Sequence, residues 1–153
     1  MAAVRILVVD DSAPWRWVVS AILQRSSRCE IIGEAFDGAQ AVQKSIELQP
    51  DMVLLDIGLP QLNGLEAARQ IRAALPNCKI ILITDLIGTC SMSGIVGVDV
   101  QACLCKCELV NDLLSTIDRV LDGGKPSGGG CSFSRYTSGL EPLLQRIPNM
   151  LLN

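Results

Sequence analysis

Short apolar runs alternate with longer amphipathic stretches from residue 4 to about residue 122 of the chain. Five of the runs are rich in β-branched residues and nearly continuous in apolar side chains: residues 5–9, 30–33, 52–55, 80–83 and 102–105. Continuous apolar runs are typical of strands that are covered on both faces, and intervening helices favour a parallel sheet. The pattern therefore predicts an α/β fold built from repeated βα units.

The stretches that follow the first and last runs have the periodicity of amphipathic helices. The first helix is predicted to begin after the capping candidate Ser12, with Pro14 in its opening turn, and its apolar stripe consists of Trp15, Val18, Val19, Ile22 and Leu23. Trp17 is expected on the surface of this helix. The last helix is predicted to stop at Gly123 and Gly124, and its stripe consists of Val110, Leu113, Leu114, Ile117, Val120 and Leu121.

Two further helices are marked by candidate capping residues. Asp37 can cap a helix that runs to about Leu48, and Asn63 can cap one that ends near Leu75. The stretch 86–98 contains three glycines, each of which costs about 1 kcal/mol in a helix relative to alanine. A fourth helix in this stretch is therefore expected to be short or frayed, and its boundaries stay open.

The composition changes at residues 123–130, which form the glycine-rich sequence GGKPSGGG. Such a sequence is typical of a linker. We therefore predict one domain at residues 1–124, followed by a linker and a short apolar tail at 125–153 without an output domain. Leucines and an isoleucine at 140–152 could form one or two amphipathic turns. Docking on the domain, pairing with a second copy and disorder all remain open for this tail.

The composition argues against several functional classes. The 153 residues are 49% hydrophobic and 19% charged, which is enough apolar content for one folded domain. The net charge of −3 and the scattered Lys and Arg residues make direct nucleic-acid binding unexpected. We find no signal peptide and no apolar stretch of about 18 residues, so we expect a cytoplasmic protein without membrane contact. The seven cysteines lack CxxC pairs, which favours reduced thiols.

Polar side chains occur where four of the five predicted strands end. Asp10 and Asp11 follow the first strand, Asp56 ends the third, Thr84 ends the fourth and Lys106 follows the fifth. Ligands of parallel α/β sheets collect at this edge, outside the carboxyl ends of the strands. Three carboxylates gathered there would repel one another without a cation, and all-oxygen ligands suit a hard ion such as Mg²⁺. The sequence therefore predicts a magnesium site.

These residues and the sequences around them resemble the response-regulator receiver family, in particular receivers that precede helix-turn-helix output domains. The resemblance covers residues 4 to about 124 and rests on LVVDDS at 7–12, DMVLLDIGLPQLNGLEAARQIR at 51–72, IILIT at 80–84 and Lys106. It implies a doubly wound, flavodoxin-like sheet of five parallel strands in the order 2-1-3-4-5, with helices on both faces. It also implies that Asp11 binds Mg²⁺ directly and Asp10 largely through water, with Asp56 and a backbone carbonyl at Gly58 or its neighbour as further ligands.

The resemblance further implies a signalling module rather than an enzyme. Asp56 would be the phosphoacceptor, and a sensor histidine kinase would be the donor. Lys106 would neutralise the phosphoryl oxygens together with Mg²⁺, and the Thr84 hydroxyl would swing onto the phosphoryl group. That movement would bias the face formed by helix four and strand five, where an output protein or a second copy would bind.

The sequence departs from the family pattern three positions before Lys106, where Cys103 replaces an aromatic residue whose rotamer usually reports the state. Asp99 and Val100 likewise replace a pair of small residues. These changes leave open an alternative, a scaffold that keeps the receiver fold and interacts without phosphorylation.

Two other hypotheses are weaker. Alternating cysteines at 103, 105 and 107 could line one face of a strand and bind a soft metal, but no fourth ligand is indicated, and buried cysteine usually packs as a small hydrophobe. A dehalogenase-like phosphotransferase would also form an aspartyl phosphate. That class resembles DxDx[TV] at its nucleophile, whereas here Asp56 is followed by Ile57 and then by Gly58 in place of the second acid.

Overall fold

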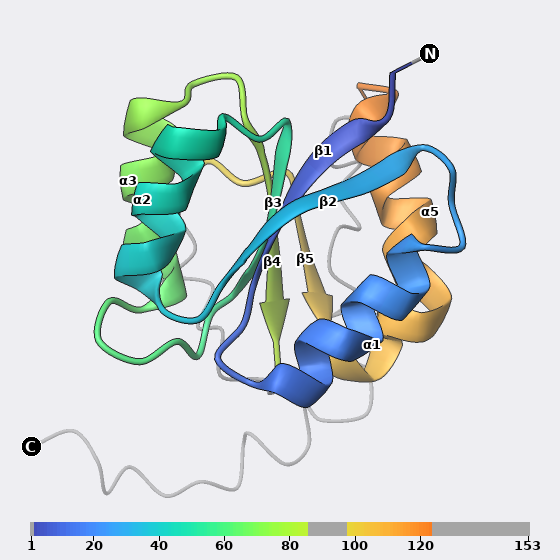
Figure 1. Cartoon of the computed structure of the whole chain (residues 1–153), viewed down its shortest axis with the longest axis horizontal. Helices are drawn as coiled ribbons and strands as arrows, with labels where there is room; N and C mark the ends of the chain where they lie inside the picture. Colours follow the sequence, from blue (N-terminus) through green and yellow to red (C-terminus); the bar gives the residue numbers. More distant parts are fainter. Residues whose placement is uncertain (1, 86–97, 124–153) are drawn as a thin grey trace, which may run out of the picture.

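The computed structural model describes residues 2–85 and 98–123. The elements in chain order are β1 (Val4–Val9), α1 (Ala13–Leu23), β2 (Cys29–Ala35), α2 (Gly38–Leu48), β3 (Met52–Asp56), α3 (Gly64–Ala74), β4 (Lys79–Thr84), β5 (Ala102–Cys105), η1 (Lys106–Glu108) and α5 (Leu109–Leu121) (Figure 1). The predicted fourth helix, apart from residue 98, and the predicted tail at 125–153 lie outside the described residues. In the described ranges, no helix combines the length and the apolar character that crossing a membrane requires.

All strand pairs are parallel, and the strand order is β2-β1-β3-β4-β5, which confirms the predicted sheet. The largest difference from the predicted strand bounds is in β2, which extends past the expected 30–33. Glu34 and Ala35 pair with Val8 and Val9 although they continue no apolar run. This strand lies at the edge of the sheet and is only partly buried, so its sequence needs less apolar character than the central strands.

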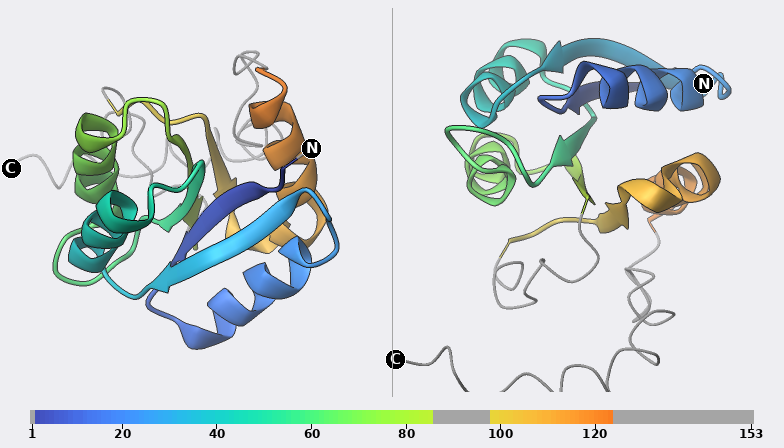
Figure 2. Two further views of the ribbon diagram at one scale, coloured as in Figure 1. Left: turned by 45° about the horizontal axis from the view of Figure 1, so that its top comes forward. Right: turned by 90° about the horizontal axis from the view of Figure 1, so that it is seen from below.

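Helices cover both faces of the sheet, α2 and α3 on one side and α1 and α5 on the other (Figures 1 and 2). Successive residues of the central strands alternate between these two layers. The layer under α2 and α3 includes Leu7, Val9, Val53, Leu55, Ile80 and Leu82. The layer under α1 and α5 includes Ile6, Val8, Met52, Leu54, Ile81 and Ile83. This explains why these strands are apolar at nearly every position.

Two of the three predicted helix caps are confirmed. The side chains of Asp37 and Asn63 each accept a hydrogen bond from the backbone N–H three residues further on, at 2.8 and 2.9 Å. Ser12 occupies the N-cap position of α1, but its side chain makes no capping hydrogen bond, so that prediction was wrong in its chemistry. Instead the Ser12 backbone N–H donates to the Asp10 carboxylate at 2.9 Å. The start of α1 is therefore tied to the end of β1.

The predicted apolar stripe of the last helix needs one correction. Val110 is 60% exposed, and Leu109 is fully buried in its place. Because η1 precedes α5, the helix begins at Leu109, and its buried positions continue at Leu113, Thr116, Ile117 and Val120. In α1, Trp15 packs against the core and Trp17 is 73% exposed, as predicted.

Arg72 at the end of α3 anchors the approach to β5. Its guanidinium donates to the carbonyls of Pro76, Cys78 and Asp99 at 2.6–3.1 Å and to the Gln101 side chain at 3.1 Å. Five such hydrogen bonds from one planar group, to four acceptors, hold α3, the start of β4 and the start of β5 in a common frame. This frame fixes the strand that ends beside Lys106.

Gly64 allows α3 to start against the end of β3. Its N–H donates to the Ile57 carbonyl at 3.0 Å, and a Cβ at this position would overlap the backbone carbonyl of Asp56. A side chain here would therefore push the first turn of α3 away from the strand that carries Asp56.

We predict that Gly64→Ala lowers the free energy of unfolding by about 1–3 kcal/mol, the usual cost of overpacking a closely packed position. Urea denaturation measures the change. Gly58→Ala is the matched control, because a Cβ at Gly58 would meet only the Asp56 Oδ1 atom at an ordinary 3.7 Å. Equal stability of the two variants would contradict the steric explanation.

Candidate functional site

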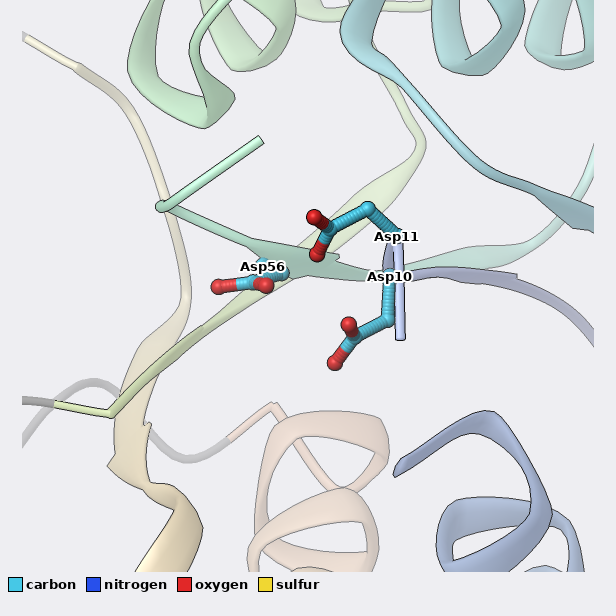
Figure 3. A group of neighbouring side chains, drawn as sticks. All are labelled: Asp10, Asp11 and Asp56. Atoms are coloured by element: carbon cyan, nitrogen blue, oxygen red, sulfur yellow. The ribbon is translucent and has the colours of Figure 1, made fainter. Parts of the chain in front are cut away.

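Three carboxylates gather at the carboxyl ends of two neighbouring strands. Asp10 and Asp11 leave the end of β1, and Asp56 is the last residue of β3 (Figure 3). Their ligand atoms all lie within 4.8 Å of one another. Asp10 and Asp56 are buried, whereas Asp11 is exposed. The cluster is therefore closed toward the sheet and open to solvent on the Asp11 side.

Each buried carboxylate is held at one oxygen by the backbone and faces Lys106 with the other. Asp10 Oδ1 accepts from the Ser12 N–H at 2.9 Å, and Asp56 Oδ1 accepts from the Gly58 N–H at 3.0 Å. The Lys106 Nζ lies 2.9 Å from Asp10 Oδ2 and 3.3 Å from Asp56 Oδ2. One ammonium group thus joins the ends of β1, β3 and β5.

The Lys106 side chain is only 4% exposed, and its Nζ lies 5.1 Å from the centre of the Trp15 ring. Burial alone would lower the pKa of Lys106. The hydrogen bond to Asp10 and the charges of Asp56, Asp10 and Asp85 outweigh burial and raise the pKa above its ordinary value. Lys106 is therefore a fixed cation, and Trp15 is its apolar neighbour.

The pKa of Asp56 is raised above its ordinary value, chiefly by burial and further by the neighbouring Asp10 carboxylate. The Gly58 N–H and Lys106 both lower the pKa, but they do not cancel these effects. The single Lys106 ammonium group contacts the carboxylates of Asp10, Asp56 and Asp85, so negative charge is in excess at this edge of the sheet. An added cation fits this excess of negative charge, and a set of carboxylate oxygens suits Mg²⁺ better than a soft metal.

The structure brings Asp10, Asp11, Asp56 and Lys106 together, as expected from the strand ends. Thr84 ends β4, is buried, and pairs in register with Cys105, the residue before Lys106. The Gly58 N–H contacts Asp56, and the expected role of the Gly58 carbonyl as a metal ligand stays a prediction.

Sequence reasoning missed Asp85. Its carboxylate lies 3.4 Å from the Lys106 Nζ and is 61% exposed, so it forms a third ion pair with this lysine from the solvent side. A signal was present, because Asp85 directly follows Thr84 at the end of a strand, the kind of position that singled out the other site residues. The contact between Trp15 and Lys106 had no comparable signal.

Within the described residues, the acidic cluster is the one group of three potential ligands that converges on a point, so the cysteines do not form the soft-metal site considered above. Cys103 is buried in the layer under α2 and α3. The strand ends at Cys105, and Cys107 lies in η1 rather than on the same strand face.

Comparison with known proteins gives a consistent result. The response regulator receiver domain model matches residues 6–118. The transcriptional regulatory protein LiaR of Bacillus subtilis is 31% identical over 123 residues, 80% of this chain and 58% of that protein. A protein-glutamate methylesterase/protein-glutamine glutaminase of Thermotoga maritima is 42% identical over 83 residues, 54% of this chain and 24% of that protein. The crystal structure of the response regulator domain of Thermotoga maritima CheB has a TM-score of 0.71 at 30% identity, covering 78% of this chain and 97% of that one.

A doubly wound parallel sheet with an acidic cluster and a buried lysine at its carboxyl edge defines a receiver-type α/β domain. The chain belongs to the response regulator receiver domain family of two-component signalling. It spans about a quarter of the length of the methylesterase relative and somewhat more than half the length of LiaR.

We predict that Asp56→Asn raises the free energy of unfolding at neutral pH in the absence of Mg²⁺. A carboxyl whose pKa is raised by folding loses stability as it ionises, so the penalty grows as pH rises above the unfolded value of about 3.9 and vanishes below it. The advantage of the variant should therefore disappear on acidification to about pH 4. Urea denaturation at both pH values, with chelator, measures it.

Glu30→Gln is the control for this experiment, because Glu30 is exposed and lies near the amino end of β2, away from the cluster. Its stability should match the wild type at both pH values. An Asp56→Asn variant that is less stable than wild type at neutral pH would show that the Lys106 pairing outweighs burial.

Proposed function

We propose that this chain is the phosphoacceptor module of a two-component phosphorelay, with Asp56 phosphorylated by a sensor histidine kinase in the presence of Mg²⁺. The observation that carries the proposal is the pair of contacts from the Lys106 Nζ to Asp10 and Asp56, which places a buried cation beside an anionic nucleophile. Family membership supports the same function at the level of two-component signalling.

The step proposed for Asp56 is a direct displacement at phosphorus. One carboxylate oxygen attacks the phosphorus of a phosphohistidine, the phosphorus–nitrogen bond breaks, and its electron pair stays on the imidazole nitrogen. The product is an acyl phosphate on Asp56, which water can later remove. Burial favours this reaction, because a weakly hydrated carboxylate needs to lose little water before it attacks.

Lys106 is placed to stabilise the charge that develops in this step. Its ammonium group already lies 3.3 Å from Asp56 Oδ2 and is desolvated, so its interaction with phosphoryl oxygens would not be screened by water. Asp10, Asp11, Asp56 and the Gly58 carbonyl are the proposed holders of Mg²⁺. When bound, Mg²⁺ supplies a second positive charge for the phosphoryl oxygens.

The proposed response runs from Thr84 to the face formed by helix four and strand five. Thr84 ends β4, the strand next to β5. A movement of its hydroxyl toward a phosphoryl oxygen would therefore shift the backbone where β4 and β5 pair. We propose that an output protein or a second copy of the chain binds this face, and that nucleic acid and membrane do not bind the chain directly. Cys103 takes the place of the family's aromatic residue in this route.

We propose a signalling role rather than an enzymatic one. The methylesterase relative matches this chain over 83 residues, 24% of that protein. The methylesterase activity of that relative is therefore not proposed for this chain.

We predict that acetyl phosphate adds one phosphoryl group to the full chain only when Mg²⁺ is present, and that Asp56→Asn abolishes the addition. Intact-mass spectrometry measures the product. Glu30→Gln should be phosphorylated like the wild type. If a folded wild-type chain gains no phosphoryl mass, the phosphoacceptor function is wrong, and the phosphorylation-independent scaffold replaces it.

A further inference from the structure

Two cysteine side chains flank Lys106 in sequence and meet in space. The Cys107 S–H donates to the Cys105 sulfur, and the two Sγ atoms lie 2.7 Å apart. Cys105 is half-buried and Cys107 is exposed. Neither thiol has a part in the proposed phosphoryl chemistry. Two contacting thiols, one exposed and one half-buried, therefore lie on either side of Lys106 in the chain.

The end of β5 explains why these sulfurs meet. On a continuous strand, residues two apart are separated by about 6.6 Å along the chain. Here the strand ends at Cys105 and η1 begins at Lys106, so the chain turns and returns Cys107 toward Cys105. A disulfide bond is about 2.05 Å long, and the two sulfurs would therefore need to approach by about 0.7 Å.

We propose that Cys105 and Cys107 form a thiol–disulfide exchange site, which a low-molecular-weight disulfide such as oxidised glutathione converts into an intramolecular disulfide around Lys106. Cys107 is the entry point, because it is the exposed thiol among the cysteines at 29, 78, 103, 105 and 107 in the described ranges. Short, exposed and constrained disulfides are generally the easily reduced ones, which makes the modification reversible.

The exchange takes place in two displacement steps at sulfur. The Cys107 thiolate attacks one sulfur of the small disulfide, whose sulfur–sulfur bond breaks and releases one small thiolate. The Cys105 thiolate then attacks the Cys107 sulfur in the mixed disulfide and releases the second small thiol. The protein pair loses two electrons and two protons, and the small disulfide is reduced to two thiols.

The hydrogen bond between the two thiols slows this exchange at neutral pH. The hydrogen bond to Cys105 is the main reason that the pKa of Cys107 is raised to about 11. Because the thiolate is the attacking species, exchange is slow at neutral pH and faster in mildly alkaline solution. Burial raises the pKa of Cys78 to about 11 as well, but that thiol is also closed to solvent.

Oxidation would act on the site through Lys106. The disulfide ring includes the Lys106 backbone, and closing it requires a Cβ–S–S–Cβ dihedral near 90° as well as a shorter sulfur–sulfur distance. A change in this backbone moves the ammonium group relative to Asp10, Asp56 and the Trp15 ring. Trp15 can therefore report the oxidation state without any phosphorylation.

The sequence offers a direct test of the bond. Trypsin cleaves after Lys106, so a Cys105–Cys107 disulfide would join peptide 80–106 to peptide 107–119. The full chain is incubated with oxidised glutathione at about pH 8, alkylated, digested without reductant and analysed by mass spectrometry. We expect the joined pair in wild type and in Cys103→Ser, its absence in Cys105→Ser and Cys107→Ser, and its loss after reduction with a dithiol.

Two outcomes would overturn the disulfide. The joined pair could persist in Cys105→Ser, which would place the bond at another cysteine of peptide 80–106. Alternatively, the wild type could give only separate glutathione adducts, which would show that the two sulfurs do not bond.

A second readout tests the coupling to Lys106. In a Trp17→Phe background, Trp15 is the single tryptophan, and its emission should change with the same dependence on the glutathione ratio as the joined peptide. Adding Cys105→Ser to this background should remove the change. If the disulfide forms and the Trp15 emission stays constant, the coupling to Lys106 is wrong. Neither readout depends on whether Asp56 accepts a phosphoryl group.

Discussion

The site depends on one interaction, the contact of the buried Lys106 ammonium group with the Asp10 and Asp56 carboxylates. These charges can meet only if β1, β3 and β5, which are far apart in sequence, end close together at one edge of the sheet. Desolvation makes each of these charges costly on its own, and their mutual contact offsets part of that cost. The geometry of the site therefore depends on how the strands pack in the sheet.

The site also contains more carboxylates than ammonium groups. Lys106 contacts three carboxylates, and the exposed Asp11 adds a fourth nearby. This excess of negative charge favours a divalent cation, and in the proposed function that cation and Lys106 would be two positive neighbours of the phosphoryl group. The same arrangement makes the position of Lys106 sensitive to its own backbone, which the thiols on either side of it can constrain.

Much of this architecture could be predicted from the sequence. Central strands that are apolar at nearly every position signalled a sheet covered on both faces. Asp37 and Asn63 marked two helix starts by side-chain chemistry that is local to a few residues. The strand ends likewise placed Asp10, Asp56 and Lys106 at one edge, because parallel topology leaves those positions little choice.

The predictions that were wrong or missing concern residues whose contacts are not determined by the local sequence pattern. Val110 fits the apolar periodicity of the last helix, but the preceding turn of η1 sets the phase of α5 and exposes it. Ser12 is a good capping residue by type and occupies the N-cap position, but its side chain makes no capping hydrogen bond. Asp85 was overlooked although it directly follows Thr84 at a strand end. The approach of Cys107 to Cys105 depends on how β5 ends in three dimensions, which residue spacing alone does not encode.

The acidic cluster beside Lys106 is expected to bind a divalent cation, and a Mg²⁺ titration followed by Trp15 emission in the Trp17→Phe background measures this binding. We predict a saturable change, because cation binding redistributes the carboxylate contacts of the ammonium group that lies 5.1 Å from the Trp15 ring. Adding Asp11→Asn should weaken the response strongly, whereas Glu30→Gln should leave it unchanged. No response to Mg²⁺, or an equal response with Asp11→Asn, would show that the acidic cluster does not bind the cation.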